Sequence, residues 1–281
     1  MRRILRKVWR EIARPFRRRY ARSIPHRTDT SISDNQAYPQ ICLNACNDYR
    51  KFNKFRRNPI YNSILEHVSE RDGKKYLDLI LKDNETMQGM DAFKSNDKYG
   101  SPFVFDYPGV ENISPTTLRY IKVLSDLKKH FGPLDGMNIC EIGVGYGGQC
   151  RIINSMYRPS TYTLVDIRPA LRLASCYLDK FVMPATLQYK TMNEISPNQY
   201  DLVISNYAFT ELPREIQTVY YEKIISKSAK GYITYNDITP KSFESFRRDE
   251  IVGMLPDADI YDENPLTHPK NCIIVWGEVS D

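Results

Sequence analysis

The chain lacks the long apolar runs and the cysteine pairs that mark membrane-spanning or disulfide-bonded proteins. Across its 281 residues no apolar run reaches the length that spans a bilayer, and the N-terminus has no uninterrupted apolar core of the kind found in secretory signals. The six cysteines form no paired CxxC clusters, and Cys42 and Cys46 alone supply only two ligands of a zinc site. We therefore expect a reduced, cytosolic protein.

Acidic residues are scarce at one end of the chain. Residues 1–22 hold ten Lys or Arg and one acid, Glu11, whereas the remaining residues hold 30 basic and 33 acidic side chains. An apolar stripe runs through the same segment, so we predict a basic amphipathic helix over residues 2–22, kinked or ended by Pro15. Such a helix suits an anionic membrane surface, and we favour peripheral binding at the inner face of a membrane over a nucleic-acid tail, a partner helix or a solvated helix folded onto the domain.

The next part of the chain shows little periodicity. Residues 23–58 are polar and interrupted by prolines, which predicts a linker with irregular structure. Apolar residues over 60–82 predict two helices that are split near Asp72-Gly73. We expect residues 83–113 to form a loop with a short strand over 103–107, and a loop of this length beside a site is often a lid.

Regular alternation of helices and strands begins at Ser114. Ser114 is the expected N-cap of a helix that Gly132-Pro133 closes. The strands that we predict after it lie at 138–142, 161–166, 186–190, 200–205, 230–236, 258–262 and 271–277, and the helices near 148–157, 169–180, 213–228 and 240–253. This alternation predicts a Rossmann-like α/β domain over 114–281, with a mostly parallel seven-stranded sheet, helices on both faces and a helical N-terminal extension.

The residues from Asn138 to Gln149 organise this domain. A short apolar run ends in Gly143, Gly145, Gly147 and Gly148, and a helical pattern follows. Glycines allow the backbone a positive φ and a close approach to a ligand, and the helix behind them offers unpaired N–H groups. Strand, glycine turn and helix together predict half of a nucleotide site.

Two cofactors compete for this turn. Gly143-x-Gly145-x-x-Gly148 fits the dinucleotide fingerprint, in which a pyrophosphate sits on the helix N-terminus. Read as Glu141-x-Gly143-x-Gly145-x-Gly147, the same residues resemble the first motif of the class I S-adenosylmethionine (SAM) methyltransferases. Glu141 favours SAM, because a carboxylate suits a cationic ligand and repels a phosphate. An ordinary glycine turn with Glu141 in a local ion pair is the third interpretation.

Polar residues follow the other predicted strands at the same edge of the sheet, where ligands bind in open α/β folds. Asp166 ends the second strand and is placed to accept hydrogen bonds from ribose hydroxyls, as an acid at this position does in both NAD and SAM sites, so it supports the fold more than the choice of cofactor. The fourth strand ends in Ser205-Asn206-Tyr207, and the fifth in Tyr235-Asn236-Asp237. His268 lies in the loop before the last strand, which we expect to be antiparallel and to start on this face.

Four blocks of the sequence resemble the bacterial sugar O-methyltransferases, whose members occur among surface-polysaccharide genes. The blocks are 114–120, 141–149, 205–212 and 271–277, and the likeness covers roughly residues 100–281. It implies a class I methyltransferase fold, SAM as the methyl donor and a sugar hydroxyl of a glycan or glycan precursor as the acceptor. The cofactor contacts that we assign are Glu141, Gly143, Gly145, Gly147, Gln149, Asp166 and Asn206, and the substrate contacts are Tyr120, Tyr207 and Asn236.

Methyl transfer to a sugar hydroxyl calls for a base that takes the hydroxyl proton. His268 is the first candidate, because an unperturbed imidazole has a pKa near neutrality, and Asp237 and Glu211 follow. An oxygen-rich Mg²⁺ site from Asn206, Asn236 and Asp237 ranks lower, because only one of the three is an acid. The alternative functions are an NAD-type oxidoreductase on the same glycines and a non-catalytic membrane- or nucleic-acid-binding protein on a methyltransferase scaffold.

Overall fold

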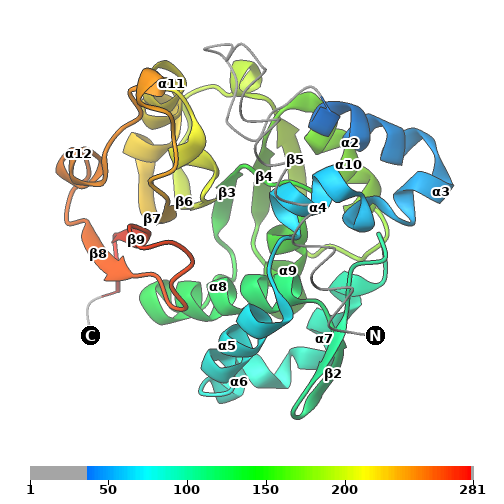
Figure 1. Ribbon diagram of the computed structural model, residues 1–281. Coiled ribbons are helices and arrows are strands. Elements are labelled where there is room, and N and C mark those ends of the chain that lie inside the picture. Colours follow the sequence, from blue (N-terminus) through cyan, green and yellow to red (C-terminus); the bar gives the residue numbers. More distant parts are fainter. Residues whose placement is uncertain (1–36, 280–281) are drawn as a thin grey trace. The chain divides into compact units, whose positions relative to one another are not determined.

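The computed structural model describes residues 37–279, and the helix expected over 2–22 lies outside them. Within the described residues a seven-stranded sheet has the order β5-β4-β3-β6-β7-β9-β8 (Figure 1). Its strands are β3 (Asn138–Ile142), β4 (Thr161–Val165), β5 (Thr186–Lys190), β6 (Tyr200–Asn206), β7 (Ser228–Tyr235), β8 (Asp259–Asp262) and β9 (Cys272–Trp276). Only β9 runs against its neighbours β7 and β8 in this sheet, so the prediction of a mostly parallel sheet with an antiparallel last strand is confirmed.

Helices cover both faces of the sheet, as the alternation predicted. One core contains side chains from α8 (Pro115–Phe131), α9 (Gly148–Met156) and α10 (Arg168–Leu178), and the other from α11 (Arg214–Lys223) and α12 (Arg248–Met254). Successive strand residues point to opposite faces; on β3, Ile139 belongs to the first core and Cys140 to the second. The chain therefore has a Rossmann-like α/β fold.

The strand boundaries agree with the sequence to within two residues, but the last two helices are shorter than expected. The helix predicted over 213–228 ends at Lys223 and continues as the 3₁₀ turn Ile225–Lys227. The helix predicted over 240–253 is a 3₁₀ turn, Lys241–Phe243, followed by α12. The core that contains α11 and α12 is formed nevertheless, because the apolar positions of both segments still reach the sheet.

Helix α8 begins and ends where the sequence indicated. The Ser114 hydroxyl accepts a hydrogen bond from the N–H of Thr117, Pro115 is in the first turn, and Gly132 ends the helix with a φ of 74°. The predicted apolar face, Leu118, Ile121, Leu124, Leu127 and Phe131, is buried. Helix α8 packs on α5 (Glu70–Ile80) and α9, so it joins the N-terminal helices to the sheet.

The described part of 23–58 is helical, which corrects the prediction of irregular structure. It contains α2 (Ala37–Asn47), α3 (Tyr49–Phe52) and the 3₁₀ turn η1 (Phe55–Arg57). The buried residues of α2 are Tyr38, Cys42 and Ala45, at helical spacing. A tyrosine, a cysteine and an alanine are only weakly apolar, so their helical spacing is hard to detect in a polar segment.

The split between the next two helices also lies elsewhere than predicted. Helix α4 (Pro59–Leu65) ends before residue 66 and α5 is capped by Ser69, so Gly73 lies inside α5. Gly73 permits close packing there, because a Cβ would lie 2.2 Å from the hydroxyl oxygen of Tyr107.

Residues 83–113 hold short elements in place of the expected loop. They are α6 (Asn84–Gln88), α7 (Met90–Lys94), the 3₁₀ turn η2 (Ser95–Asp97) and an antiparallel pair, β1 (Phe105–Tyr107) and β2 (Val110–Ile113). The predicted strand thus exists over 105–107.

A buried ionic network holds these N-terminal elements against the glycine turn. Arg56 is fully buried and its guanidinium binds the carboxylate of Glu66 through two nitrogens and that of Asp97 through a third. It also lies over the ring of Tyr146, with 4.9 Å between its Cζ and the ring centroid. Tyr146 in turn receives a hydrogen bond from Asn96, so the turn is anchored by residues that precede the α/β domain.

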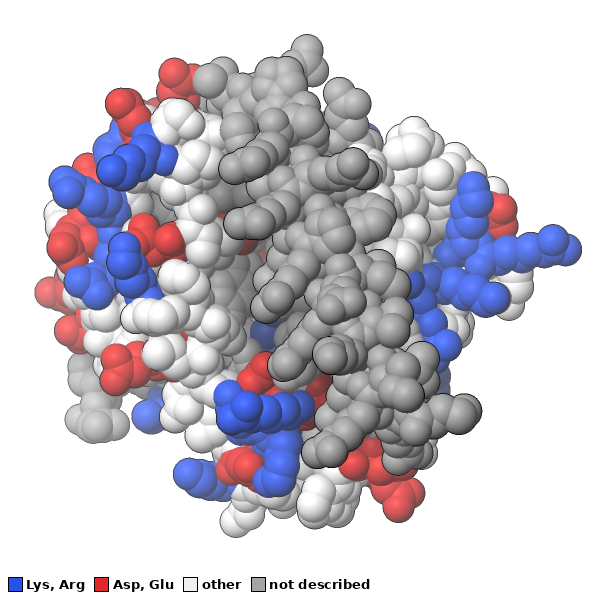
Figure 2. Space-filling model, viewed as in Figure 1, with Lys and Arg blue, Asp and Glu red and all other residues white. Residues whose placement is uncertain are grey.

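Among residues 37–279 no helix is long and apolar enough to cross a membrane. On the face shown in Figure 2, basic and acidic side chains are interspersed where Figure 1 draws α11 and α12. This agrees with the near balance of charges in the sequence beyond residue 22.

Candidate active site

The glycine turn follows β3 directly and has an unusual backbone. Gly143, Gly145 and Gly147 have φ values of 79°, 54° and 85°, a region that L-residues with a side chain rarely adopt. A Cβ on Gly143 would lie 2.0 Å from the Cβ of Ala208, and one on Gly145 would lie 3.0 Å from Leu65. The turn therefore requires glycine for conformation and for space.

Asp166 places a carboxylate on this turn. It follows β4, and its Oδ2 accepts a hydrogen bond of 3.0 Å from the N–H of Gly145 while its Oδ1 accepts one from Ile167. The dinucleotide interpretation needs the N–H groups of the turn for a pyrophosphate. Here a carboxylate already occupies one of them, so a pyrophosphate would meet like charge. The donor set fits a ligand that brings cationic groups and hydroxyls.

Glu141 lies inside β3 and not at its end. It is 3% exposed, and the hydroxyl of Tyr162 donates a 2.7 Å hydrogen bond to its Oε2. Burial raises the pKa of Glu141 to about 8, with the Asp166 charge acting in the same direction. Burial therefore favours the neutral form of Glu141, and of the two acids Asp166 is the one that contacts the turn.

The remaining glycine-motif residues pack helices together. A Cβ on Gly147 would lie 2.9 Å from Leu178 on α10. Gln149 is buried, its side-chain N–H donates to the carbonyl oxygen of Tyr120, and its Oε1 has no hydrogen-bond partner within the described part of the chain. Gln149 thus links α9 to α8 and keeps one buried acceptor unused.

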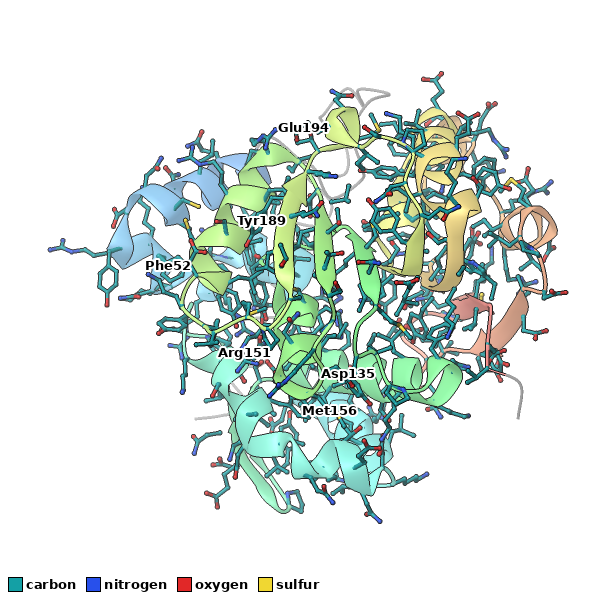
Figure 3. All side chains as sticks on the ribbon, turned by 180° about the vertical axis from the view of Figure 1, so that it is seen from behind. Phe52, Asp135, Arg151, Met156, Tyr189 and Glu194 are labelled. Atoms are coloured by element: carbon teal, nitrogen blue, oxygen red, sulfur yellow. The ribbon has the colours of Figure 1, made fainter. Side chains whose placement is uncertain are left out.

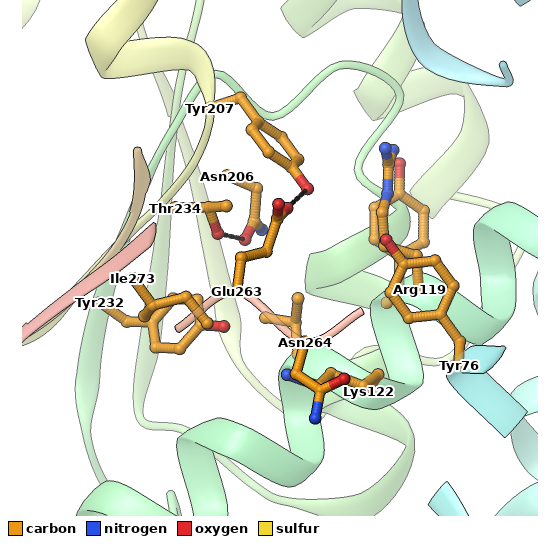
Figure 4. Close-up of a pocket in the computed structure, with 12 residues that line it drawn as sticks. Tyr76, Arg119, Lys122, Asn206, Tyr207, Tyr232, Thr234, Glu263, Asn264 and Ile273 are labelled. Atoms are coloured by element: carbon orange, nitrogen blue, oxygen red, sulfur yellow. Dashed lines mark hydrogen bonds between the residues drawn. The ribbon is translucent and has the colours of Figure 1, made fainter. Parts of the chain in front are cut away.

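A pocket opens at the carboxyl ends of β6 and β7 (Figure 4), and β6 is the strand beside β3. Its lining comes from α5, α8, the strand ends and the loop after β8: Tyr76, Arg119, Tyr120, Lys122, Val123, Asn206, Tyr207, Tyr232, Thr234, Glu263, Asn264 and Ile273. Three residues assigned from sequence, Tyr120, Asn206 and Tyr207, come together here. Most of the lining side chains carry hydroxyl, amide or charged groups.

Tyr207 and Glu263 form the polar centre of this pocket. The Tyr207 hydroxyl donates to the carboxylate of Glu263, as the dashed line in Figure 4 shows, and Glu263 is 7% exposed. Thr267 donates to the same carboxylate through its N–H and its hydroxyl. Burial raises the pKa of Tyr207 well above its ordinary value, so the phenol stays protonated and remains a donor.

Tyr207 is held in a strained backbone conformation. Its φ is 68°, which is uncommon for a residue with a bulky side chain. The conformation is fixed by hydrogen bonds from its N–H to the carbonyl oxygen of Thr234 and from the hydroxyl of Thr210 to its own carbonyl oxygen. This turn directs the ring into the pocket, and strain of this kind is typical of functional positions.

Asn236, Glu211, Asp237 and His268, which were also assigned from sequence, do not line the pocket. The amide of Asn236 donates to Glu211 at 2.9 Å, and Asp237 accepts a hydrogen bond from Lys270 at 2.6 Å. His268 is exposed in the loop between β8 and β9, and its carbonyl oxygen accepts a hydrogen bond from the N–H of Asn271. The roles of His268, Asp237 and Glu211 as bases, and of Asn236 as a substrate contact, remain predictions from the sequence.

Tyr76, Arg119 and Glu263 are among the lining residues that the sequence analysis did not assign to the site. Arg119 lay inside a recognised block, but nothing in its spacing separated it from surface arginines. Glu263 belongs to an acidic run in which no member stands out. Within the described residues no group of three His, Cys, Asp or Glu side chains is arranged to hold a metal ion.

Comparisons with known proteins give matches among solved structures alone. A scan against models of protein families finds no match, and neither does a search of curated proteins. Among solved structures, protein 1320 of Thermoplasma acidophilum is 17% identical over 59% of this chain and 91% of that chain, with a TM-score of 0.41.

Two methyltransferase structures match at a similar level. Magnesium protoporphyrin IX methyltransferase from Synechocystis PCC 6803 with bound S-adenosylhomocysteine (SAH) is 12% identical over 70% of this chain and 98% of that chain, with a TM-score of 0.42. An rRNA methylase from Streptococcus thermophilus is 13% identical over 58% of this chain and 98% of that chain, with a TM-score of 0.40. At TM-scores below 0.5 these matches carry no argument about ligand or substrate.

Proposed function

We propose that this chain is a SAM-dependent O-methyltransferase that methylates a sugar hydroxyl of a glycan or glycan precursor. The observation that carries the proposal is the carboxylate of Asp166 on the N–H of Gly145, one strand away from a pocket. A carboxylate on the glycine turn favours a ligand with cationic groups. An open α/β sheet binds its ligands at this edge.

Different residues at the turn are expected to contact different parts of SAM. Asp166 is the partner for the ribose hydroxyls, and the turn of Gly143 and Gly145 brings the backbone N–H groups to the same end of β3. When bound, SAM supplies an electrophilic methyl group on a sulfonium. A base of the chain would take the proton that the acceptor hydroxyl loses in this transfer.

The pocket is the proposed acceptor site. Its amide and hydroxyl groups, among them Asn206, Thr234 and Asn264, match the many hydroxyls of a sugar. Tyr207 joins the pocket to the end of β6, next to β3, where the methyl group would arrive. The choice of a sugar rests on the sequence resemblance.

Glu263 is our structural candidate for the group that receives the proton. It is the carboxylate that lines the pocket, and the hydroxyls of Tyr207 and Thr267 orient it. His268, Asp237 and Glu211 remain the candidates from sequence. A sugar hydroxyl is a weak nucleophile, so loss of the true base should lower turnover more than binding.

Calorimetry with SAM, SAH, NAD and NADP tests the cofactor. Micromolar binding of the two sulfur compounds, with none of NAD or NADP, supports the proposal; binding of NAD alone contradicts it. Transfer of a radiolabelled methyl group from SAM to a panel of neutral and acidic sugars then tests the acceptor. Labelled product that alkali does not hydrolyse is expected for an ether, whereas an ester would release its label.

Residues 2–22 give a separate proposal about location. We propose that this segment holds a cytosolic protein at an anionic membrane surface, because it combines ten basic residues in 1–22 with an apolar stripe. Flotation of the full chain with anionic vesicles, but not with neutral ones, is expected. A chain that lacks residues 1–22 should stay with the soluble fraction, and equal flotation of both chains would reject the proposal.

A further inference from the structure

Arg119 is a buried arginine whose hydrogen-bonding capacity is nearly unused. It is 9% exposed, on α8. A guanidinium has five N–H donors, yet within residues 37–279 Arg119 makes one hydrogen bond, of 3.3 Å, to the carbonyl oxygen of Leu65. The Cζ atom of Arg119 lies over the rings of Tyr120 and Tyr207, at 5.6 and 5.8 Å from the ring centroids. No described carboxylate forms an ion pair with it.

Arg56 shows what this fold does with a buried arginine that has a structural role. Arg56 makes five hydrogen bonds, three of them to the carboxylates of Glu66 and Asp97. Burial of a charge without a partner is costly. Arg119 differs from Arg56 in these few bonds, and it lines the pocket, so its remaining N–H groups lie where a ligand can reach them.

Arg119 lies where the two halves of the proposed site meet. It binds the carbonyl group of Leu65, whose side chain lies 3.0 Å from the place of a Cβ on Gly145. It also lines the pocket with Tyr207 and Glu263, and Figure 4 shows it opposite Asn206 and Thr234. An anion beside this guanidinium would lie in the pocket, and Leu65 would connect this position to the glycine turn.

We infer that Arg119 is the anchor of a carboxylate-binding subsite at this junction. The planar fork of a guanidinium matches the two oxygens of a carboxylate. A phosphate dianion fits less well, because the carboxylate of Glu263 lines the same pocket. The identity of the ligand rests on the proposed function: the carboxylate belongs either to the methionine part of SAM or to an acidic sugar acceptor such as a uronic acid.

Matched pairs of ligands distinguish the two sources. SAM is compared with decarboxylated SAM, and glucuronate with glucose, the sugars in the presence and absence of SAH. Binding is measured by calorimetry to the wild-type chain, R119K and R119M. We expect the wild type to bind one carboxylate ligand roughly 10- to 100-fold more tightly than its neutral counterpart, as a charge-assisted bidentate bond provides. R119M should bring that ratio close to one, and R119K should give an intermediate value.

Arg151 provides the control. It is buried on α9 (Figure 3), donates to the carbonyl oxygen of Ala92 and stacks on Phe181, and it too forms no ion pair with a described carboxylate, but it does not line the pocket. R151M should therefore keep the preference for the carboxylate ligand. Thermal melting and near-ultraviolet circular dichroism of each variant report whether it has folded.

The outcomes separate this inference from the proposed function. If R119M loses the preference for SAM over decarboxylated SAM, the subsite belongs to the cofactor. If it loses the preference for glucuronate over glucose, the subsite belongs to the acceptor. A folded R119M that keeps the preference, or a wild type that shows none in either pair, overturns the inference. Failure of the wild type to bind SAM and SAH at all contradicts the proposed function, and the sugar pair without SAH then still decides the role of Arg119.

Discussion

The hydroxyl of Tyr162 donates a 2.7 Å hydrogen bond to the carboxyl group of Glu141, and this is the hydrogen bond that holds a buried acid beneath the glycine turn. Burial raises the pKa of Glu141 from its ordinary 4.5 to about 8, and the Tyr162 bond opposes this rise. A folded chain therefore retains a proton on Glu141 at pH values where the unfolded chain has released it.

Stability should fall with rising pH because of Glu141. Its folded pKa lies above its unfolded pKa, so the stabilisation by its neutral form is complete below about pH 4.5 and is lost as the pH rises through about 8. The free energies of unfolding of E141Q and wild type, measured with urea, should change equally with pH near pH 4. They should diverge between pH 5 and 9. The difference should reach on the order of a few kcal/mol in favour of E141Q.

Tyr162→Phe provides the opposite check on the same group. It removes the donor that favours ionised Glu141, so the loss of stability should move to higher pH. Parallel curves for wild type, E141Q and Y162F across this range would show that Glu141 does not titrate as its burial requires.

SAM affinity should depend on the same acid. A cationic ligand near the turn favours ionised Glu141, so binding should release a proton below pH 8 and strengthen between pH 6 and 9. Calorimetry of the wild type in buffers of different ionisation enthalpy measures the proton release. E141Q should release none and should bind SAM with an affinity that changes less with pH.

Asp166→Asn should weaken SAM binding by roughly tenfold or more, because the charge on the Gly145 N–H and the acceptor for the ribose hydroxyls are lost together. The matched control is Asp201→Asn. Asp201 also accepts a backbone hydrogen bond, from Asn138 at 2.7 Å, but at the first residue of β3, the end away from the turn. Equal Kd values for wild type and D166N would remove the argument on which the choice of cofactor rests.

Turnover and SAM affinity should separate for the pocket residues. Glu263→Gln removes the proposed proton acceptor, so methyl transfer should fall about 100-fold or more with little change in the Kd for SAM. Tyr207→Phe removes one donor to Glu263 and should have a smaller effect of the same kind.

The corresponding test of the sequence-based base is His268→Ala. If His268 takes the proton, H268A should lose turnover as severely as we expect for E263Q, and E263Q should stay active. If Glu263 does so, the order reverses. Full activity of both variants would shift attention to Asp237 and Glu211.

The parts of this molecule that the sequence revealed are those governed by local rules. Strand β9 is a continuous apolar run, and Ser114, Pro115 and Gly132 act on the ends of their own helix. These signals operate over a few residues, so boundaries such as those of β3 and β5 could be predicted directly.

The parts that were missed depend on contacts between distant residues. Gly73 resembles a helix break until Tyr107, from β1, is placed against it. Arg56 resembles a surface arginine, since Asp97 and Ser114 lie 41 and 58 residues away along the chain. Glu263 and Arg119 line the same pocket only after the chain has folded. No periodicity records such pairings.

The Arg56 network gives the last prediction. Arg56→Met should lower the free energy of unfolding by about 3 to 5 kcal/mol, because Glu66 and Asp97 would remain buried without their counter-charge. The control is Arg214→Met, whose ion pair with Glu250 is over a third exposed and should matter by less than about 1 kcal/mol. Since Arg56 also stacks on Tyr146 beside Gly145, R56M should weaken SAM binding at temperatures where it remains folded. Urea unfolding and calorimetry measure the two effects, and a stable R56M with normal SAM affinity would mean that the N-terminal helices do not support the glycine turn.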